Sequence, residues 1–414
     1  MTMNHLTKPV VEPALLINQL KVLLHDPESL EDDAQRQELK RLCRQAAEVL
    51  EAPFETVQRL AYSPLPLVTS RIAQEHRLFK TLVAAEEPVD LASLIKISGF
   101  ESRILESILD YLGTQNMVVE AEPGCFSATK LTHLLTVPLF QDAVTHFHDN
   151  CLPAFMAFNA VLSNPSRNLT AFKVGQHSEE DFYTWMETHP VQQGAFHRFM
   201  EAQFASLPIW LDAIDFETEM AKDISPTEVV FVDVGGGAGH QCGALKKKLP
   251  ELKGRVILQD RPEVLKKALP INGMEKVGYD FLTEQPVKGI FSKYEALNYW
   301  LTSGQDARVY YFRQIMHNFD DETCIKILQS QLSAMGPNSV IVIDDKVLPD
   351  TKPLPGTPGV EYTAALSLAM KVMFDALERR ESHWRQLLAS AGLEIRSIRK
   401  FTKFDDAAII ATKY

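Results

Sequence analysis

The sequence lacks the features that several large classes of protein require. Its five cysteines are an odd number without a C-x-x-C pair, so they indicate neither a disulfide framework nor a zinc site. No apolar run approaches the roughly 18 residues of a membrane-spanning helix, and the N-terminus has no apolar core of the signal-peptide type. We therefore expect a cytoplasmic protein with free thiols.

The charge balance argues against two further classes of partner, nucleic acids and anionic membranes. Asp and Glu number 54 against 42 Lys and Arg, which gives a net charge of -12, whereas nucleic-acid-binding proteins present a basic surface. An acidic chain is also not attracted to anionic lipids. We expect no nucleic-acid or membrane partner. A length of 414 residues is enough for two domains with their own cores.

Residues 1–137 are predicted to form a first, mainly helical domain. Apolar residues recur at helical spacing up to about residue 62. Residues 69–137 then give three helical segments and a hairpin with Pro123-Gly124 at its turn, an order typical of a winged helix. The third of these segments carries three acidic residues against one arginine, which favours a role in dimerisation over DNA binding.

The rest of the chain divides into two further parts. Residues 138–222 are helical and rich in aromatic residues, and we expect this layer to contribute to a substrate pocket. In residues 223–414 short β-branched runs alternate with helical stretches. This alternation predicts an α/β domain, in which helices cover both faces of a parallel sheet.

The segment VVFVDVGGGAGHQ, residues 229–241, joins a predicted strand to a predicted helix through three consecutive glycines. It does not match the dinucleotide pattern G-x-G-x-x-G, because His240 or Cys242 stands where the last glycine belongs. It also lacks the Gly-Lys-Ser/Thr ending of a phosphate-binding loop. The next strand ends at Asp260, the acidic position that binds ribose hydroxyls in such folds. A nucleoside without phosphates, namely S-adenosylmethionine, fits this combination.

Six segments resemble, in order and spacing, the class I S-adenosylmethionine-dependent O-methyltransferases of the plant and fungal caffeate type: VDVGGGAGH, LQDRPEVL, YDFL, FRQIMHNFDDE, IDDKVLPD and ALERRESHW. The resemblance covers about residues 69–414. It implies a Rossmann-like catalytic domain, an N-terminal winged-helix dimerisation domain and a homodimer. The cofactor-binding positions that it implies are Gly235, Gly237 and Asp260 for methionine and ribose, Asp280 and Phe281 for adenine, and Arg313 as a basic contact.

The same resemblance implies the catalytic groups. In this family a histidine removes the proton of the substrate hydroxyl while two carboxylates orient its ring, and a base with a pKa near neutrality suits this task. The matching residues are His317 as the base, with Asp345 and Glu378 as the carboxylates. Asp345 is one methylene shorter than the glutamate usual at that position. We predict no metal site.

Lys346 is a second departure from the family pattern, because an apolar residue usually follows the first carboxylate. It is interpreted either as a surface charge or as a donor to a substrate carbonyl. The second interpretation matters because a small branch of the family, the fungal pericyclases of pyridone alkaloid pathways, keeps the cofactor without consuming it and uses cationic donors. His146 and His148 are further candidates for that role. The complete His317, Asp345 and Glu378 set favours methyl transfer.

The pocket walls and one insertion are less well defined by the sequence. We expect side chains of the helical layer and of the helix LSLAMKVMF to line the pocket. The alternative interpretation is that these apolar side chains only pack in the cores between helices. Ile290–Asp306 has no counterpart in the family pattern and is interpreted either as a lid or as an unremoved intron. The candidate substrate residues besides the two histidines are Phe196, Met200, Met370, Met373 and Phe374.

Overall fold

The computed structural model describes residues 12–26, 30–164, 169–202, 207–288, 306–353, 357 and 359–414. Contacts divide the chain into two units, residues 1–63 and 64–414. Each unit is described by itself. Across the described segments, no helix combines the length and the apolar character that crossing a bilayer requires.

The first unit consists of α1 (Pro13–His25), α2 (Asp33–Leu50) and α3 (Pro53–Ala61). Asp32 caps α2 by accepting a hydrogen bond from the amide of Ala34 at 2.8 Å. None of the described residues in these helices is buried. Their amphipathic sequences therefore leave many apolar side chains exposed: Leu15, Leu16, Ile17, Val22, Leu24, Leu42, Val49, Leu50, Phe54, Val57 and Leu60.

The second unit begins with a helical segment that carries a small sheet. Its strands have the order β1-β3-β2, and the predicted hairpin with Pro123-Gly124 at its turn is confirmed by the antiparallel pairing of β2 with β3. The first predicted helix is interrupted at Arg77, whose φ of 61° ends one helix and begins the next. The elements are α4 (Leu65–Glu75), α5 (Leu78–Ala84), β1 (Val89–Asp90), α6 (Leu91–Ser98), α7 (Ser102–Thr114), β2 (Val118–Glu122), β3 (Cys125–Ala128) and α8 (Lys130–Leu135).

A helical layer follows, and it includes one turn of π-helix, η2 (His146–Cys151). This wide turn precedes Pro153, which has no N–H to continue the α-helical hydrogen bonds. Buried side chains of the layer form one apolar cluster together with Val372 and Met373. The other elements are α9 (Pro138–Thr145), α10 (Leu152–Ser163), α11 (Ala171–Gly175), α12 (Phe182–Glu187), α13 (Pro190–Ala202), η3 (Trp210–Asp212) and α14 (Phe216–Glu219).

An eight-stranded sheet organises the C-terminal part, with the order β10-β11-β8-β7-β4-β5-β6 and β9 paired with β8. Strands β4 to β8 run parallel, whereas β10 and β11 are antiparallel. The predicted Rossmann-like sheet is confirmed; β6 was not predicted, because its sequence MEKVG has no apolar run. The strands are β4 (Val229–Val234), β5 (Arg255–Asp260), β6 (Met274–Gly278), β7 (Val309–Arg313), β8 (Val340–Leu348), β9 (Arg379–Arg380), β10 (Leu393–Lys400) and β11 (Asp406–Lys413).

Helices cover both faces of this sheet, as strand alternation requires. Tyr310 and Phe312 pack with α17 (Asp321–Leu332) and α19 (Glu381–Ser390). On the other face, Phe231 and Tyr311 pack with α15 (His240–Lys248). The parallel strands thus end at one edge, where ligands bind in open α/β sheets.

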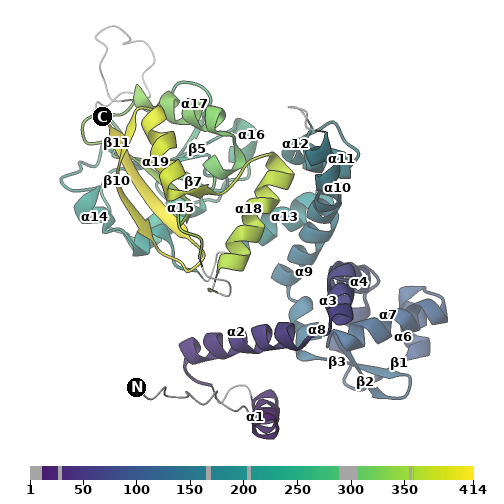
Figure 1. Cartoon of the computed structure of the whole chain (residues 1–414). Helices are drawn as coiled ribbons and strands as arrows, with labels where there is room; N and C mark the ends of the chain where they lie inside the picture. Colours follow the sequence, from purple (N-terminus) through teal and green to yellow (C-terminus); the bar gives the residue numbers. More distant parts are fainter. Residues whose placement is uncertain are drawn as a thin grey trace, which may run out of the picture. The chain divides into compact units, whose positions relative to one another are not determined.

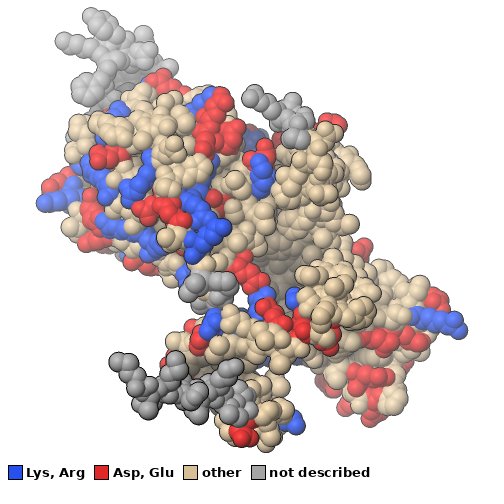
Figure 2. Space-filling model, in the orientation of Figure 1, with Lys and Arg blue, Asp and Glu red and all other residues tan. Residues whose placement is uncertain are grey.

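One long helix, α18 (Val360–Phe374), links the sheet to the helical layer. Figure 1 shows it between the sheet and α10–α13, and it contacts both α10 and α11. On the face drawn in Figure 2, Lys and Arg alternate with Asp and Glu over the sheet, while uncharged residues dominate the helical layer. On this face, α18 therefore lies between a charged part of the molecule and a largely uncharged one.

Candidate active site

The glycine turn between β4 and α15 has the backbone conformation that glycine favours. Gly235 and Gly237 have φ values of 70° and 59°. A Cβ at Gly235 would lie 2.8 Å from Ile315 Cδ1, and one at Gly236 would lie 2.4 Å from Asp233 Cγ. At Gly237, by contrast, no described heavy atom lies within 4 Å of that position. The turn is therefore packed on one side and open on the other.

Asp260 joins this turn to the end of β5. Its Oδ2 accepts a hydrogen bond from the Gly237 amide at 2.8 Å, and its Oδ1 accepts one from Arg261 at 2.7 Å. Burial raises the pKa of Asp260, against the effect of these two amides. The structure thus brings together the two sequence features from which a nucleoside site was predicted.

The two predicted adenine residues lie just after β6. Asp280 accepts a hydrogen bond from the Leu282 amide at 3.0 Å. Phe281 packs against Phe319 at 5.8 Å between ring centroids, and its ring approaches within 3.6 Å of the position of a Gly235 Cβ. Phe281 therefore reaches the glycine turn, whereas Asp280 mainly shapes its own loop.

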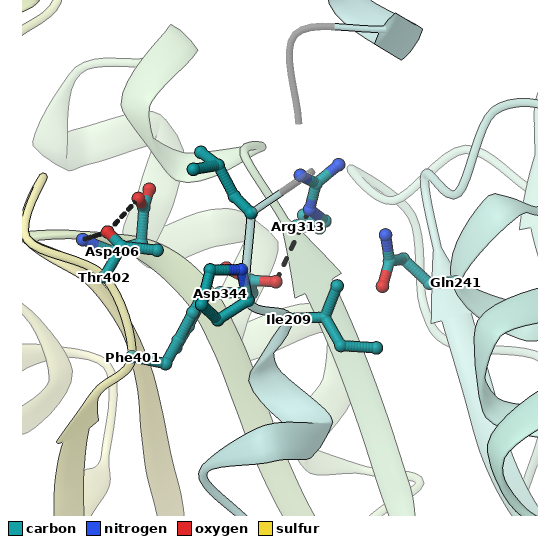
Figure 3. Close-up of a pocket in the computed structure, with 9 residues that line it drawn as sticks. Ile209, Gln241, Arg313, Asp344, Phe401, Thr402 and Asp406 are labelled. Carbon is teal, nitrogen blue, oxygen red and sulfur yellow. Dashed lines mark hydrogen bonds and ion pairs between the residues drawn. The ribbon is translucent and has the colours of Figure 1, made fainter. Parts of the chain in front are cut away.

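Arg313 lies at the end of β7 and lines a small cavity with Ile209, Gln241 and Asp344, among others (Figure 3). Its Nε is 3.4 Å from Asp344 Oδ2, and the same oxygen accepts a hydrogen bond from Tyr311 at 2.5 Å. Burial raises the pKa of Asp344 to about 6. The predicted basic contact is thus a partly exposed guanidinium beside a buried carboxyl.

His317 lies in a short 3₁₀ turn, η4 (Met316–Asn318), directly after β7. Its Nδ1 donates a hydrogen bond to Glu378 Oε1 at 2.9 Å. The nearest oxygen of Asp345 is 3.7 Å from the same nitrogen, outside hydrogen-bond distance. All three predicted residues are thus brought together, but only Glu378 holds the ring. The shorter side chain of Asp345 leaves the gap.

The two carboxylates change the protonation of His317. Burial opposes the charged imidazole, but the negative charges of Asp345 and Glu378 and the hydrogen bond to Glu378 raise the pKa of His317 to about 9. Burial also raises the pKa of Asp345. With Nδ1 bonded to Glu378, the neutral ring has its basic lone pair on Nε2.

Several carboxylate oxygens here have no hydrogen-bond partner in the described part of the chain: both of Asp345 and Oε2 of Glu378. The ligand atoms of these residues and His317 lie within 4.8 Å of one another, a spacing that could also accommodate a metal ion. The 2.9 Å bond between imidazole and carboxylate gives His317 a protein partner already.

Lys346 is buried, with 2% of its surface exposed. Its Nζ donates hydrogen bonds to Asp406 Oδ1 at 2.6 Å and to the Phe404 carbonyl at 2.8 Å, and it lies 5.5 Å from the Tyr362 ring centroid. Two of its three donors are thus bound to the β11 side of the sheet. Lys346 is therefore not a surface charge, which was the first interpretation of the sequence. As a donor to substrate, the second interpretation, it would have one N–H left beyond these two bonds.

The two candidate histidines of the helical layer have different surroundings. His146 is buried, and its Nδ1 accepts a hydrogen bond from Asn150 Nδ2 at 2.9 Å. Burial lowers the pKa of His146 to about 4. His148 instead donates to Asp149, 2.7 Å away, which also accepts from Arg71 of α4. His146 therefore lies in the apolar interior of the layer, and His148 lies beside the ion pair of Arg71 with Asp149.

The other candidate substrate residues gather around α18 and α13. Phe196 lies 5.3 Å from the His146 ring, and Phe374 lies 5.6 Å from the Phe182 ring. Met373 is 4% exposed and belongs to the same apolar cluster. Met200 and Met370 are partly buried.

Two features remain: one predicted segment, and one residue that was not predicted from the sequence. Ile290–Gln305, which makes up nearly all of the predicted insertion, lies outside the described residues. Arg379, which follows Glu378, was not singled out, although it contacts the backbone of the His317 turn. The only signal was its place in the segment ALERRESHW.

Comparison with known proteins places these features in a family. A model described as an O-methyltransferase domain matches residues 220–394. The O-methyltransferase ucdC of Aspergillus ustus is 32% identical over 389 residues, which cover 92% of this chain and 94% of ucdC. A structure titled "A Pericyclic Reaction enzyme" and one of LepI in complex with SAM both superpose with a TM-score of 0.80 and 27% identity, over 97% of this chain and all of theirs.

Proposed function

Because the chain belongs to the O-methyltransferase family, whose cofactor is S-adenosylmethionine, we propose that it methylates a hydroxyl of a small aromatic, polyketide or pyridone-type secondary metabolite. The observation that carries the proposal is the 2.9 Å hydrogen bond between His317 Nδ1 and Glu378 Oε1. It leaves Nε2 of the ring as the atom that accepts the substrate proton.

The glycine turn is the proposed cofactor site. Gly235 and Gly237 would present bare backbone, Asp260 would bind ribose hydroxyls, and Phe281 would contact the adenine. The open space at Gly237 fits a ligand there, because no described atom fills it. When bound, S-adenosylmethionine supplies a methyl group on a positively charged sulfonium. Arg313 is proposed to contact the polar end of the cofactor.

The protein's own residues would handle the proton. Because the pKa of His317 is raised to about 9, its neutral form would become available when the bound sulfonium lowers that pKa. The neutral ring would then take the hydroxyl proton at Nε2, and Glu378 and Asp345 would stabilise the resulting imidazolium. With both carboxylates ionised, the protonated triad carries a net negative charge, which favours a cation beside it. His146, Phe196, Met200, Met370, Met373 and Phe374 are proposed to line the substrate side, at the junction of the helical layer with α18.

A pericyclase is the second candidate, supported by the likeness to the structure titled "A Pericyclic Reaction enzyme" at 27% identity. The unpartnered oxygens of Asp345 also support it, because a buried carboxyl with a raised pKa is a donor when protonated. The two bonds of Lys346 to Asp406 and Phe404 count against that lysine as the main donor to substrate.

One experiment separates the two candidates. The full chain is incubated with S-adenosylmethionine bearing a deuterated methyl group and with phenols, hydroxylated polyketides, 2-pyridones and dehydratable alcohol precursors. Mass spectrometry of a methyltransferase reaction shows a labelled product and an equal amount of S-adenosylhomocysteine. A dehydrated or rearranged product with the cofactor unconsumed identifies a pericyclase. Cofactor binding without either product contradicts the proposal.

We also propose that the protein is a homodimer, with residues 1–137 as the dimerisation part. Support comes from the exposed apolar side chains of α1–α3, which include Phe54 and Leu60 at 70% and 62% exposure. Sedimentation of the full chain is expected to give a dimer, and Leu60→Glu to weaken it. Gln58→Glu adds the same charge at an exposed polar position of α3 and serves as the control. A monomeric wild-type chain contradicts the proposal.

A further inference from the structure

We propose that Arg379 is a positioning residue that fixes the turn carrying the catalytic histidine, an inference that rests on the proposed role of His317. Arg379 is 3% exposed and directly follows Glu378. Burial of a guanidinium is costly unless its donors are satisfied. The identity of its acceptors therefore indicates what the residue is for.

Two of these acceptors are backbone carbonyls on either side of His317. Arg379 Nη1 donates to the carbonyl of Met316 at 2.8 Å, and Nη2 donates to that of Phe319 at 2.8 Å. The Met316 carbonyl also accepts the Phe319 amide of the turn itself at 3.2 Å, whereas the Phe319 carbonyl is bound by side chains, namely Arg379 and the more distant Cys324 thiol at 3.6 Å. The planar fork of one arginine thus bridges the first and last parts of the turn.

The guanidinium is itself held from other directions. Its Nε donates to Asp321 Oδ1 at 2.9 Å, at the start of α17. Its Cζ lies 5.4 Å from the Trp384 ring centroid, and Trp384 Nε1 donates to the Lys346 carbonyl at 2.9 Å. Arg379 also pairs with Val347 across β8 and β9. These contacts connect the His317 turn, through Arg379, to α17, α19 and β8. We call this set of Arg379 contacts the clamp.

Two consecutive residues thus act on one turn in different ways. Glu378 contacts the imidazole, and Arg379 contacts the backbone that carries it. The hydrogen bond to Glu378 constrains only Nδ1, so the position of Nε2 also depends on where the backbone lies. A displacement of about 1 Å at a reacting atom costs about a hundredfold in rate. Loss of the clamp is therefore expected to lower catalysis without removing any group that touches substrate.

The test compares Arg379→Met and Arg379→Lys with Arg385→Met, which removes an exposed arginine paired with Glu381. The full chain is prepared with isotope-labelled histidine, and the His317 signal is identified by its absence in His317→Asn. Imidazole titration by NMR and methyl transfer are then measured for each variant. Calorimetry records S-adenosylmethionine affinity as a control.

In Arg379→Met we expect the His317 pKa to move toward its ordinary value, because a displaced turn weakens the bond to Glu378. We expect kcat to fall about a hundredfold, KM and cofactor affinity to change less than threefold, and Arg379→Lys to recover part of the loss. Should Arg379→Met fail to fold, Asp321→Asn weakens the ion pair of the guanidinium, together with the contact between Asp321 and His383, and is expected to shift the same signal.

The proposal would be overturned if the folded Arg379 variants kept the wild-type pKa of His317 and a kcat within twofold of wild type. This outcome differs from failure of the proposed function, in which His317→Ala keeps its activity whatever Arg379 does. An equal loss in Arg385→Met would also count against the clamp, because that residue is 55% exposed at its side chain and does not touch the turn.

Discussion

The His317 turn and the helical layer each hold a histidine with little exposed surface, yet their surroundings shift its pKa in opposite directions. His317 has Glu378 and Asp345 beside it, and its pKa is raised to about 9. His146 is surrounded by Phe147, Phe196 and other rings, and burial lowers its pKa to about 4. Charged neighbours, more than depth, decide whether a buried imidazole carries a proton.

The difference supports the different tasks that we propose for the two regions. An imidazole that gains a proton easily and is held by a carboxylate is suited to proton removal from a hydroxyl. A neutral imidazole among aromatic rings is suited to shaping an apolar surface and to offering one hydrogen bond. Substitution of either histidine tests the comparison.

The largest effect is expected for His317→Ala. Removal of a general base lowers methyl transfer by about 10²- to 10⁴-fold, whereas S-adenosylmethionine affinity should stay within about threefold of wild type. Rates with labelled cofactor and calorimetric titration measure the two effects. His133→Ala removes an exposed histidine and serves as the control. An active His317→Ala chain would place the base elsewhere.

A second prediction concerns stability as a function of pH. Both histidines have a pKa near 6.5 when unfolded. Between pH 6.5 and about 4 only the unfolded chain protonates His146, so stability falls as the pH decreases. Between pH 6.5 and about 9 only the folded chain keeps the proton of His317, so stability falls as the pH rises.

Denaturant unfolding at about pH 5, 7 and 9 measures both slopes. His146→Asn should flatten the acid side and His317→Asn the alkaline side, each by about 2 kcal/mol over these pH values. If both variants keep the wild-type slopes, the contrast between the two regions is wrong.

A smaller effect is expected at the glycine turn, which belongs to neither region. Asp260→Ala removes the acceptor of the Gly237 amide and a proposed ribose contact, so S-adenosylmethionine should bind about tenfold more weakly. Glu263→Ala, an exposed carboxylate of the same segment, is the matched control. Unchanged affinity in Asp260→Ala would move the cofactor away from β5.

Most of the fold could be predicted, because its sequence patterns are compatible with only one kind of secondary structure and burial. Apolar runs such as VVFVDV and VIVIDD are long enough to be buried on both faces, so their place in a parallel sheet was predictable. The edge strand β6 was not, because half-exposed residues such as Glu275 interrupt its apolar pattern. The break at Arg77 also went unpredicted, since a positive φ in arginine leaves no signal in the pattern.

The candidate site was predictable where local motifs determine it. His317 and Glu378 lie 61 positions apart in sequence but within one hydrogen bond, and the resemblance to a known family supplied that pairing. The bonds of Lys346 to Asp406 and Phe404 depend on how β8 pairs with β11. Such contacts arise from tertiary packing, and composition or spacing does not encode them.

The most direct test of the account is the titration of His317 in the full chain, with and without cofactor. We predict a pKa near 9 in the free protein. S-adenosylmethionine should lower it, because a sulfonium beside the imidazole disfavours a second positive charge. S-adenosylhomocysteine, which is uncharged at sulfur, should lower it far less. An identical response to the two compounds, or none, would contradict a cofactor site that faces His317.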